Sequence, residues 1–288
     1  KEIKITRVHL EEDTGRLIHF GHIGHSLIDF NRAGVPLMEL VTEPDFRSGE
    51  EASAFAQELQ LILRYLGVSD ANMEKGQMRV EANISLRLSG SKELGTKVEV
   101  KNLNSFKAVR DAVDYEVMRQ TEILENGKKI VQETRGFNET KGETFSQRIK
   151  EQSHDYRYFP EPDLPPLKID VRLVEEIKSL LPELPHEKRA RFKNQYGLAS
   201  DQINIFVSNK HLAGFFENVI SELLNWDKEE PSPHVVENLP ASDLSRRQWQ
   251  AGEKQELFNL AANYLLGDVL ALLNETSTDV NEMRISAE

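Results

Sequence analysis

The feature of this sequence that most constrains its fold is a regular alternation of apolar and polar residues at positions 78–88. Because successive side chains of a β-strand point to opposite faces of a sheet, this segment predicts a strand with one buried face and one polar face. Residues 97–101, Lys-Val-Glu-Val-Lys, repeat the alternation after a Ser-Gly-Ser turn. The two segments together predict an antiparallel hairpin, because antiparallel sheets tolerate one face in contact with water.

Shorter strand patterns and two long helical patterns surround this hairpin. One helix is predicted to begin at Ser48, which forms a capping box with Glu51, and the other to begin at Asn104 or Ser105. Strand patterns occur at residues 3–5, 17–20, 27–30, 37–41, 130–137 and 144–149. The first part of the chain is therefore predicted to be an α+β domain built on antiparallel sheet.

The composition changes at residues 160–166, which contain four of the eleven prolines. Such a segment suits neither a helix nor a central strand. After it every periodic pattern is helical, at residues 171–181, 186–196, 200–207, 212–224 and 244–273. We therefore place a boundary near Ile169 and predict a first domain at residues 1–168 and an all-α domain at residues 169–288.

The overall composition restricts the kinds of site and location. Since the chain has no cysteine, disulfides, zinc–thiolate sites and thiol nucleophiles are excluded. The net charge of −12 argues against an extended surface for a polyanion but is compatible with small basic patches. The longest apolar run, residues 260–273, includes Asn263 and Asp268 and is too short and too polar to span a membrane.

The start of the chain also carries information. No signal peptide is present, so we expect the protein in the cytoplasm or inside an organelle. The sequence begins at Lys1 with a strand pattern already under way, so we expect an excerpt that starts inside a domain.

Two short motifs resemble ligand sites but are interpreted as turns. The segment GSKELGTK at residues 90–97 has the last two residues of a phosphate-binding loop in the wrong order, and it joins two strands instead of opening a helix. His19, His22 and His25 recur every third residue around glycines. A transition-metal site is conceivable there, but exposed imidazoles on a flexible turn are favoured because ligand histidines need supporting hydrogen bonds.

Two carboxylates are candidate ligands of a hard cation. Glu39 lies within the apolar strand pattern at residues 37–41, where an unpaired buried carboxylate is costly. Glu12 lies in an acidic run, residues 11–13, at the end of another strand pattern. Carboxylate oxygens suit Mg²⁺, so Glu12 and Glu39 are the predicted metal ligands and catalytic residues. The alternatives are a charged turn at residues 11–13 and a structural ion pair between Glu39 and Arg32.

Cationic and acidic side chains share the polar face of the predicted hairpin. A solvated sheet face is the default interpretation. The alternative is one wall of a nucleotide cleft, in which cations meet phosphates and acids meet a metal. This interpretation predicts the cofactor-binding residues Arg79, Glu81, Asn83, Lys97, Glu99 and Lys101. A second basic run, residues 188–193, predicts either a solvated helix face or a contact with an RNA backbone.

Four stretches resemble the B subunit of the tRNA-dependent aspartyl/glutamyl amidotransferases, the GatB family. They are VHLEEDTGR at residues 8–16, DFNRAGVPLMELVTEPD at 29–45, GTKVEVKNLNSF at 95–106 and DYRYFPEPDLPPL at 155–167. They follow the family's order and spacing across the first domain. Residues 170–288 share only the helical pattern and scattered residues.

The resemblance implies a catalytic (cradle) domain with a fold like that of glutamine synthetase, then a helical domain and a tail domain. It implies a carbon–nitrogen ligase that uses ATP and Mg²⁺ to phosphorylate the side-chain carboxylate of Glu-tRNA(Gln) or Asp-tRNA(Asn), before ammonia from glutamine displaces the phosphate. The partners implied are the amidase, or A, subunit and the small C subunit of a heterotrimer, without a membrane. Glu12 and Glu39 correspond to its Mg²⁺-binding acids. An opening strand with a Glu-x-His pair, and the tail domain, are expected outside these residues.

Two other classes of function are compatible with the sequence. One is a non-catalytic scaffold that positions tRNA or the amidase, with Glu12 and Glu39 in structural ion pairs. The other is a Mg²⁺-dependent phosphohydrolase that uses the same carboxylates. Phosphate release that requires charged tRNA would separate the ligase from both.

Overall fold

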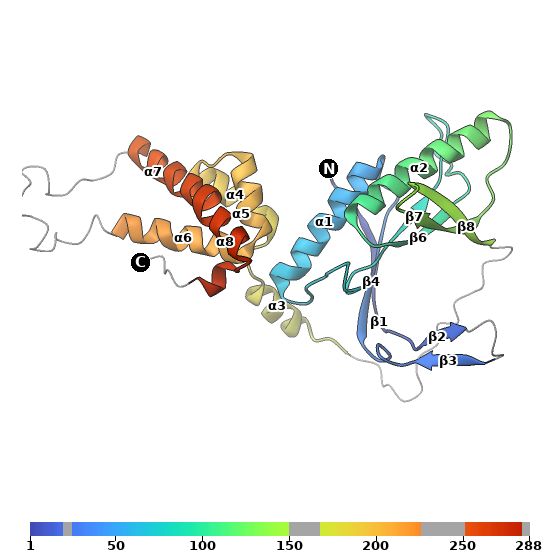
Figure 1. The fold of residues 1–288 in the computed structure, drawn as a ribbon, viewed down its shortest axis with the longest axis horizontal. Coiled ribbons are helices and arrows are strands. Elements are labelled where there is room, and N and C mark those ends of the chain that lie inside the picture. The colour runs from blue at the N-terminus through green and yellow to red at the C-terminus, as the bar shows by residue number, and fades with distance from the viewer. Residues whose placement is uncertain (20–24, 150–167, 226–250, 284–288) are drawn as a thin grey trace, which may run out of the picture. The chain divides into compact units, whose positions relative to one another are not determined.

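The computed structural model describes residues 1–19, 25–149, 168–225 and 251–283 (Figure 1). The chain divides into two compact units, and neither is a continuous stretch of sequence. The first unit comprises Lys1–Gln57 and Arg79–His154, and the second comprises Glu58–Met78 and Asp155–Glu288. Residues 58–78 thus belong to the helical unit. The single boundary predicted near Ile169 assigned them to the first domain instead. That boundary stays a prediction, because it adjoins residues 150–167, which lie outside the described part.

Two antiparallel ribbons form one part of the first unit. β1 (Ile5–Glu12) pairs with β4 (Pro36–Thr42), and β2 (Arg16–His19) pairs with β3 (Ser26–Asp29). The register of the first ribbon places His9 opposite Glu39 and Glu12 opposite Pro36. The strands predicted at residues 17–20, 27–30 and 37–41 are confirmed for the residues that the structure describes. The strand predicted at residues 3–5 is wrong in position, because β1 begins at Ile5, opposite Thr42 at the end of β4, and runs to Glu12.

A four-stranded sheet forms the other part, in the order β5 (Val80–Ile84), β6 (Val98–Leu103), β7 (Glu133–Asn138) and β8 (Glu143–Ile149). The predicted antiparallel hairpins β5–β6 and β7–β8 are confirmed. β6 and β7 pair in parallel, which the sequence did not predict. A parallel pair requires a crossover, and α2 (Phe106–Glu125) provides it.

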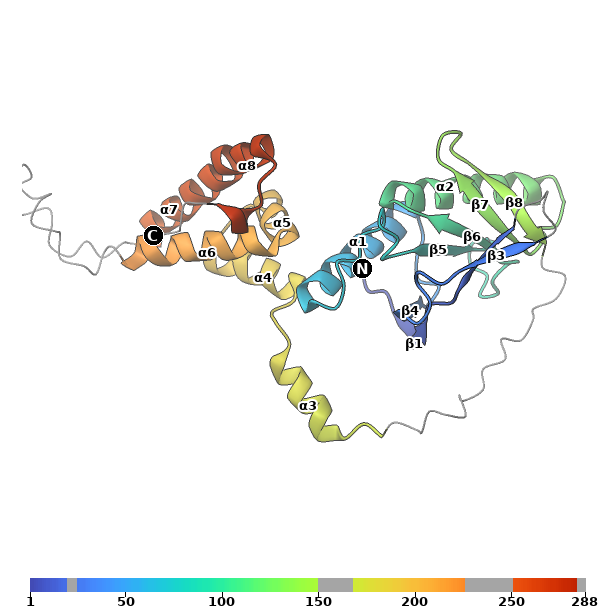
Figure 2. The same cartoon turned by 60° about the horizontal axis from the view of Figure 1, so that its bottom comes forward.

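α2 covers the apolar face of this sheet (Figure 2). Ser105 begins the helix as its N-cap by accepting a hydrogen bond from the Ala108 N–H. The core between helix and sheet consists of Ile84, Val100, Leu103, Ala108, Val109, Ala112 and Val113. The apolar side of the predicted hairpin therefore packs where the alternation placed it, and its polar side faces away from α2.

A buried charge network continues this interface beyond the apolar core. Glu116 of α2, 0% exposed, accepts two hydrogen bonds from Arg119, at 2.9 and 2.8 Å, and one from the Thr144 hydroxyl at 2.5 Å. Arg135 Nε of β7 lies 3.1 Å from Glu116, and Arg135 Nη1 donates to Glu133 at 2.6 Å. The network joins α2 to β7 and β8 with every charge paired.

The second unit is helical, as the sequence predicted. Its described elements are α3 (Val171–Leu180), α4 (Pro185–Tyr196), α5 (Ser200–Ser208), α6 (Lys210–Asn225), α7 (Ala251–Tyr264), the π-helical turn η2 (Leu265–Val269), α8 (Leu270–Thr276) and the 3₁₀ turn η3 (Val280–Glu282). Several aromatic side chains lie in its core, and Tyr196 contacts Phe216 and Phe258 edge to face. The first part is thus consistent with the predicted α+β class, and the described residues of the second part are helical, as predicted.

α1 (Gly49–Leu66) belongs to both units. Its first residues pack with the sheet unit, where Ser53 donates a hydrogen bond to the carbonyl oxygen of Phe106 at 2.9 Å. Its last turn belongs to the helical core through Tyr65, whose hydroxyl donates to the carbonyl oxygen of Val207 at 2.9 Å.

One continuous helical stretch, Gly252–Thr276, is long and apolar enough by length and composition to cross a membrane. Phe258, Ala262, Leu265 and Leu273 of this stretch are buried in the core of the second unit. A single helix of this kind is weak evidence for a membrane span, because other helices can pass the same test of length and composition.

Candidate functional site

The predicted metal ligands Glu12 and Glu39 both lie on the β1–β4 ribbon. The side chain of Glu39 is 43% exposed, and Arg7 Nη2 lies 3.8 Å from its carboxylate. The expectation that Glu39 is poorly solvated is therefore wrong, because a two-stranded ribbon leaves this face open. Glu12 is exposed at the end of β1. Glu39 is opposite His9 in the ribbon, and Glu12 lies three residues further along β1 than His9. Strand alternation then places the two carboxylates on opposite faces, so the ribbon does not bring them together.

Asp13, the next residue, is the acid that this region holds most tightly. Its side chain is 15% exposed and pairs with Arg32 Nε at 2.9 Å and Arg79 Nη2 at 3.7 Å. The alternative in which Arg32 pairs with Glu39 is therefore wrong, because Arg32 pairs with Asp13. Since Arg79 directly precedes β5, Asp13 connects the end of the β1–β4 ribbon to the polar face of the sheet.

The polar face of β5 and β6 brings together several of the residues that were predicted to bind a nucleotide. Lys101 Nζ lies 3.2 Å from Glu81 and 3.7 Å from Glu99. Asn83 is opposite Glu99 in the register, which places the two on the same face. Lys97 precedes β6 and is exposed.

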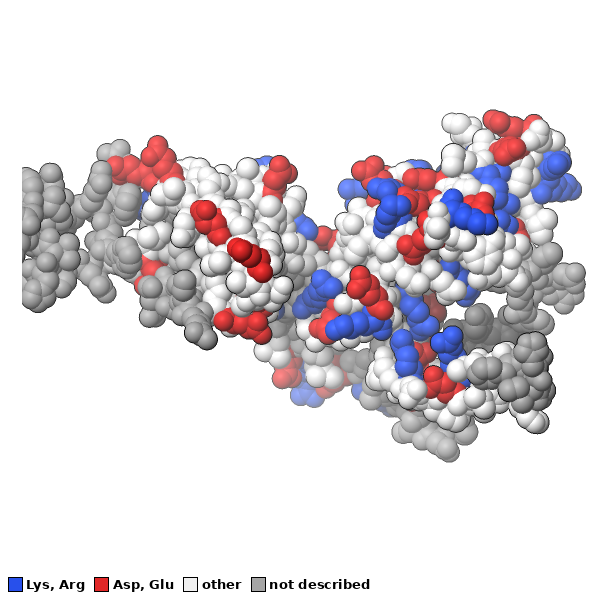
Figure 3. All heavy atoms as spheres, in the orientation of Figure 1, with Lys and Arg blue, Asp and Glu red and all other residues white. Residues whose placement is uncertain are grey.

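Thr134 of β7 is a member of this face that the sequence did not reveal. Its hydroxyl donates to Glu99 Oε2 at 2.8 Å, and Glu99 is 14% exposed. Only the parallel pairing of β6 with β7 brings the two together. On the side of the first unit drawn in Figure 3, basic and acidic side chains are interspersed rather than separated by sign.

Lys188, Arg189 and Arg191 of the basic run of α4 form ion pairs within the helical unit, while Lys193 is exposed. Arg189 makes two hydrogen bonds to Glu58, each of 2.8 Å. Arg191 makes two to Glu183, at 2.6 and 2.7 Å, and a further one to Glu217. Neither predicted interpretation of this run, a solvated face or an RNA contact, describes these partly buried pairs.

The pairs of Arg191 also shift the ionisation of their members. Hydrogen bonds to Glu183 and Glu217 raise the pKa of Arg191, and the hydrogen bond from Arg191 lowers the pKa of Glu183. Burial alone would raise the pKa of Glu217, but the hydrogen bonds from Arg191 and Lys188 outweigh it, and the pKa is lowered. All three groups are therefore charged at neutral pH.

Within the described ranges, no three His, Asp or Glu side chains are close enough to hold a metal ion by themselves. His19 Nδ1 lies 2.7 Å from the Ser26 hydroxyl across the β2–β3 ribbon, and His22 lies outside the described residues.

Comparison with known proteins decides the family. The model of the GatB/GatE catalytic domain matches residues 1–175, which include the polar sheet face, Glu12 and Glu39. The chain belongs to the GatB/GatE family. The resemblance seen in four sequence stretches is thereby confirmed.

Curated relatives agree with this assignment. The chain is 43% identical over 283 residues to the B subunit of the aspartyl/glutamyl-tRNA(Asn/Gln) amidotransferase from Caldicellulosiruptor saccharolyticus, covering 98% of the chain and 52% of the relative. It is 46% identical over 257 residues to the same-named subunit from Carboxydothermus hydrogenoformans, covering 88% and 52%. The one from Coxiella burnetii is 45% identical over 288 residues, covering 100% and 54%. The chain spans about half the length of these relatives.

The four family stretches fall on distinct parts of the fold. Residues 8–16 form the second half of β1 and the turn that holds Asp13, and residues 29–45 include β4. Residues 95–106 run from the β5–β6 loop through β6 to the start of α2. Residues 155–167 lie outside the described residues. The three stretches that can be placed thus form much of the β1–β4 ribbon and the β6 strand of the polar face in the GatB/GatE domain.

Proposed function

We propose that this chain carries the ATP-dependent activation step of a tRNA-dependent amidotransferase. The substrates are Glu-tRNA(Gln), Asp-tRNA(Asn) or both, and the product is the side-chain amide, made with ammonia from glutamine. The observation that carries the proposal is the match of residues 1–175 to the GatB/GatE catalytic domain. The names of the relatives supply the class of enzyme, an aspartyl/glutamyl-tRNA amidotransferase.

The polar face suits the demands of this chemistry. A carboxylate is a weak and anionic nucleophile toward a phosphate, so the protein must position the reactants and neutralise charge rather than supply a nucleophile of its own. Lys101 and Arg79 bring positive charge to the face, and Glu99 is fixed by Thr134. When bound, Mg²⁺–ATP supplies the phosphoryl group and the charge that neutralises it.

Glu12 and Glu39 are the carboxylates that we propose for Mg²⁺. Both are hard oxygen donors accessible to solvent, which is the ligand chemistry that Mg²⁺ prefers. Mg²⁺ in phosphoryl-transfer sites is usually held by one or two carboxylates together with substrate phosphates. Either acid can therefore contribute from its own face of the ribbon without the other beside it.

The remaining elements of the proposal follow from the family. We propose a glutamine-synthetase-like cradle at residues 1–168 and a helical domain at residues 169–288. We propose the amidase, or A, subunit and the small C subunit as partners in a heterotrimer. The cytoplasm is the proposed location, where charged tRNA is used in translation.

Glu39→Gln in the assembled amidotransferase tests the function. Because Glu39 is half exposed and its cation is 3.8 Å away, the substitution should change the free energy of unfolding by less than about 1 kcal/mol. Phosphate release and amide formation with charged tRNA should be lost, with partial recovery when Mg²⁺ is raised or replaced by Mn²⁺. Glu122→Gln, at an exposed position of α2, is the control and should be fully active.

Other outcomes point to other functions. Full activity of both Glu12→Gln and Glu39→Gln would make the chain a scaffold. Phosphate release that proceeds equally without charged tRNA would make it a phosphohydrolase.

A further inference from the structure

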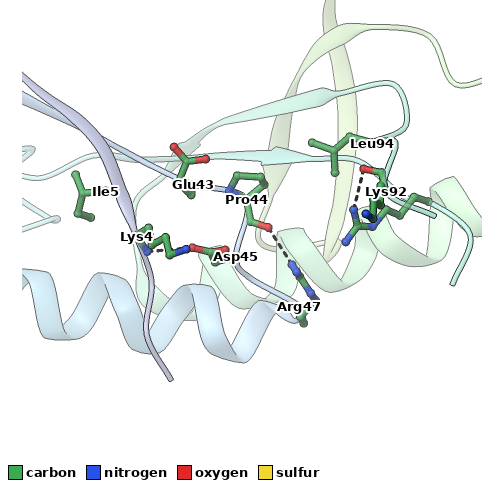
Figure 4. Close-up of a pocket in the computed structure, with 9 residues that line it drawn as sticks. Lys4, Ile5, Glu43, Pro44, Asp45, Arg47, Lys92 and Leu94 are labelled. Carbon is green, nitrogen blue, oxygen red and sulfur yellow. Dashed lines mark hydrogen bonds between the residues drawn. The ribbon is translucent and has the colours of Figure 1, made fainter. Parts of the chain in front are cut away.

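A pocket of about 550 Å³ lies in the first unit, and neither Glu12 nor Glu39 is among its lining residues (Figure 4). Its charged lining residues are Lys4, Arg47, Arg87 and Lys92, with Glu43 and Asp45. Four cations thus face two acids, in a chain whose net charge is −12. The pocket therefore has a local excess of positive charge, although the chain as a whole is acidic.

The two acidic side chains of the pocket accept hydrogen bonds from residues at or beside its walls. Glu43 Oε1 accepts a hydrogen bond from the Thr6 hydroxyl at 2.7 Å. Asp45 Oδ2 accepts one from the backbone N–H of Lys4 at 3.0 Å, which closes the start of β1 onto the segment after β4. Both carboxylates therefore act as structural acceptors.

The two arginines are held in place without losing their charge. Arg47 Nη1 donates to the carbonyl oxygens of Pro44 and Phe46, at 2.9 and 2.7 Å. Arg87 Nη1 donates to the carbonyl oxygen of Lys92 at 3.2 Å. Within the described part of the chain, neither guanidinium forms an ion pair with a carboxylate. Guanidinium groups oriented by carbonyl oxygens keep further N–H groups for an anion, which is how arginine recognises phosphate.

The loop between β5 and β6 supplies Arg87, Lys92 and Leu94 to the pocket. This loop is held closed by Gly95, where an added Cβ would lie 2.1 Å from the carbonyl oxygen of Leu86. The loop contains the GSKELGTK segment that resembles a phosphate-binding loop. It has no helix to cradle a phosphate, so any anion here must be bound by side chains.

The pocket lies at the opposite end of the β1–β4 ribbon from Glu12. Lys4 precedes β1 and Glu12 ends it, and eight residues of extended chain span roughly 27 Å at about 3.4 Å each. An anion bound here is therefore remote from Glu12 and from the Asp13 end of the ribbon. This distance favours a role in holding a long substrate over a role in the chemical step.

We propose that this pocket binds backbone phosphates of the RNA substrate. Its cations come from three separate segments: the residue before β1, the β4–α1 connection and the β5–β6 loop. Cations spread in this way suit successive phosphates of a strand. Ile5, Pro44 and Leu94 add apolar surface for ribose or base. The inference deepens the proposed function and rests on it for the identity of the RNA.

The test is a double variant, Lys4→Ala with Lys92→Ala, whose exposed side chains make no ion pair in the described residues. The matched control is Lys128→Ala with Lys129→Ala, two exposed lysines of the same unit. Affinity for a tRNA probe and for Mg²⁺–ATP is measured from 0.1 to 1 M salt. Each lost phosphate contact lowers the salt slope by about 0.7–0.9, so tRNA should bind about 25- to 60-fold more weakly at 0.1 M. The loss should vanish near 1 M.

Three results would overturn the proposal. An equal loss in the control would show a general effect of charge. Weaker Mg²⁺–ATP binding with unchanged tRNA affinity would make this the nucleotide pocket. Unchanged binding of both probes would leave an acidic protein segment as the remaining occupant.

A kinetic readout separates this proposal from the proposed function. In the assembled amidotransferase the double variant should raise KM for charged tRNA and leave kcat unchanged, because Glu12 is remote from the lysines and Glu39 pairs with Arg7 and does not line the pocket. If the wild-type complex releases no phosphate with charged tRNA, the proposed function fails whatever the pocket binds.

Discussion

Glu116 of α2 tests most directly how the first unit is held together. Its carboxylate is 0% exposed, accepts hydrogen bonds from Arg119 and Thr144, and lies 3.1 Å from Arg135. Glu116→Gln keeps an oxygen acceptor but removes the negative charge between two guanidinium groups. Removing one partner of a buried charge pair costs about 3–5 kcal/mol. We expect the free energy of unfolding to fall by about 3 kcal/mol, at the low end of this range. Both arginines keep a second acidic partner, because Glu133 lies 2.6 Å from Arg135 and 4.0 Å from Arg119.

Native-state hydrogen exchange measures this loss element by element. A loss of about 3 kcal/mol corresponds to roughly 150-fold faster exchange of the protected amides of α2 and β8, at 1.36 kcal/mol per tenfold. Amides of the helical unit serve as the internal reference. Glu122→Gln, exposed on the same helix, is the control and should stay within about 0.5 kcal/mol of the wild type.

The same carboxylate makes the sheet unit sensitive to acid. Burial raises the pKa of Glu116, but hydrogen bonds from Arg119, Thr144 and Gln120 outweigh it, so the pKa lies below its ordinary value of 4.5. The unfolded chain therefore binds this proton at higher pH than the folded protein does. The stabilisation is complete above pH 4.5 and is lost as the pH falls through the folded value. A loss under about 1 kcal/mol, or α2 exchange as acid-sensitive in Glu116→Gln as in the wild type, would refute this reasoning.

Three further changes have defined outcomes. Arg191→Met should destabilise the helical unit by about 2 kcal/mol, below the fully buried range because the side chain is a third exposed, and should leave the salt dependence of tRNA binding unchanged. The control Arg172→Met, at a side chain that is 93% exposed, should change neither the stability nor the salt dependence. Tyr65→Phe should cost about 1 kcal/mol in thermal unfolding. Burial raises the pKa of Tyr65 to about 12, so the variant should also abolish a loss of stability between pH 10 and 12. Gly95→Ala should cost about 1–3 kcal/mol and weaken tRNA binding, since the β5–β6 loop must move; a crystal structure with the loop unmoved would contradict this.

Local patterns predicted the elements of this fold well. The alternation at residues 78–88 correctly predicted that β5 pairs with β6 and which face packs against α2. This succeeded because a strand with one buried face has apolar residues at every second position. The strand β5 ends at Ile84, earlier than the alternation does, because the following residues turn into the loop that Gly95 closes.

Contacts between distant segments could not be predicted in the same way. Arg189 meets Glu58 across 131 residues, so most of a basic run that was expected to be surface forms partly buried ion pairs instead. Thr134 reaches Glu99 only through the parallel pairing of β6 and β7. Glu39 was expected to be buried because its neighbours are apolar, but a two-stranded ribbon buries neither face fully. These outcomes depend on tertiary neighbours that no local window contains.

The division of α1 between the two units has a consequence for how the chain is made. Tyr65 leaves the ribosome 142 residues before its partner Val207. At about 5–20 residues per second, that interval lasts roughly 7–28 s. During this time the last turn of α1 presents Tyr65 and Leu61 to solvent, without the helices that bury them. The sheet unit can complete its own contacts first, but the helical unit must wait until residues 58–78 can meet α5 and the helices after it. A chaperone that holds nascent chains would find its exposed apolar target here.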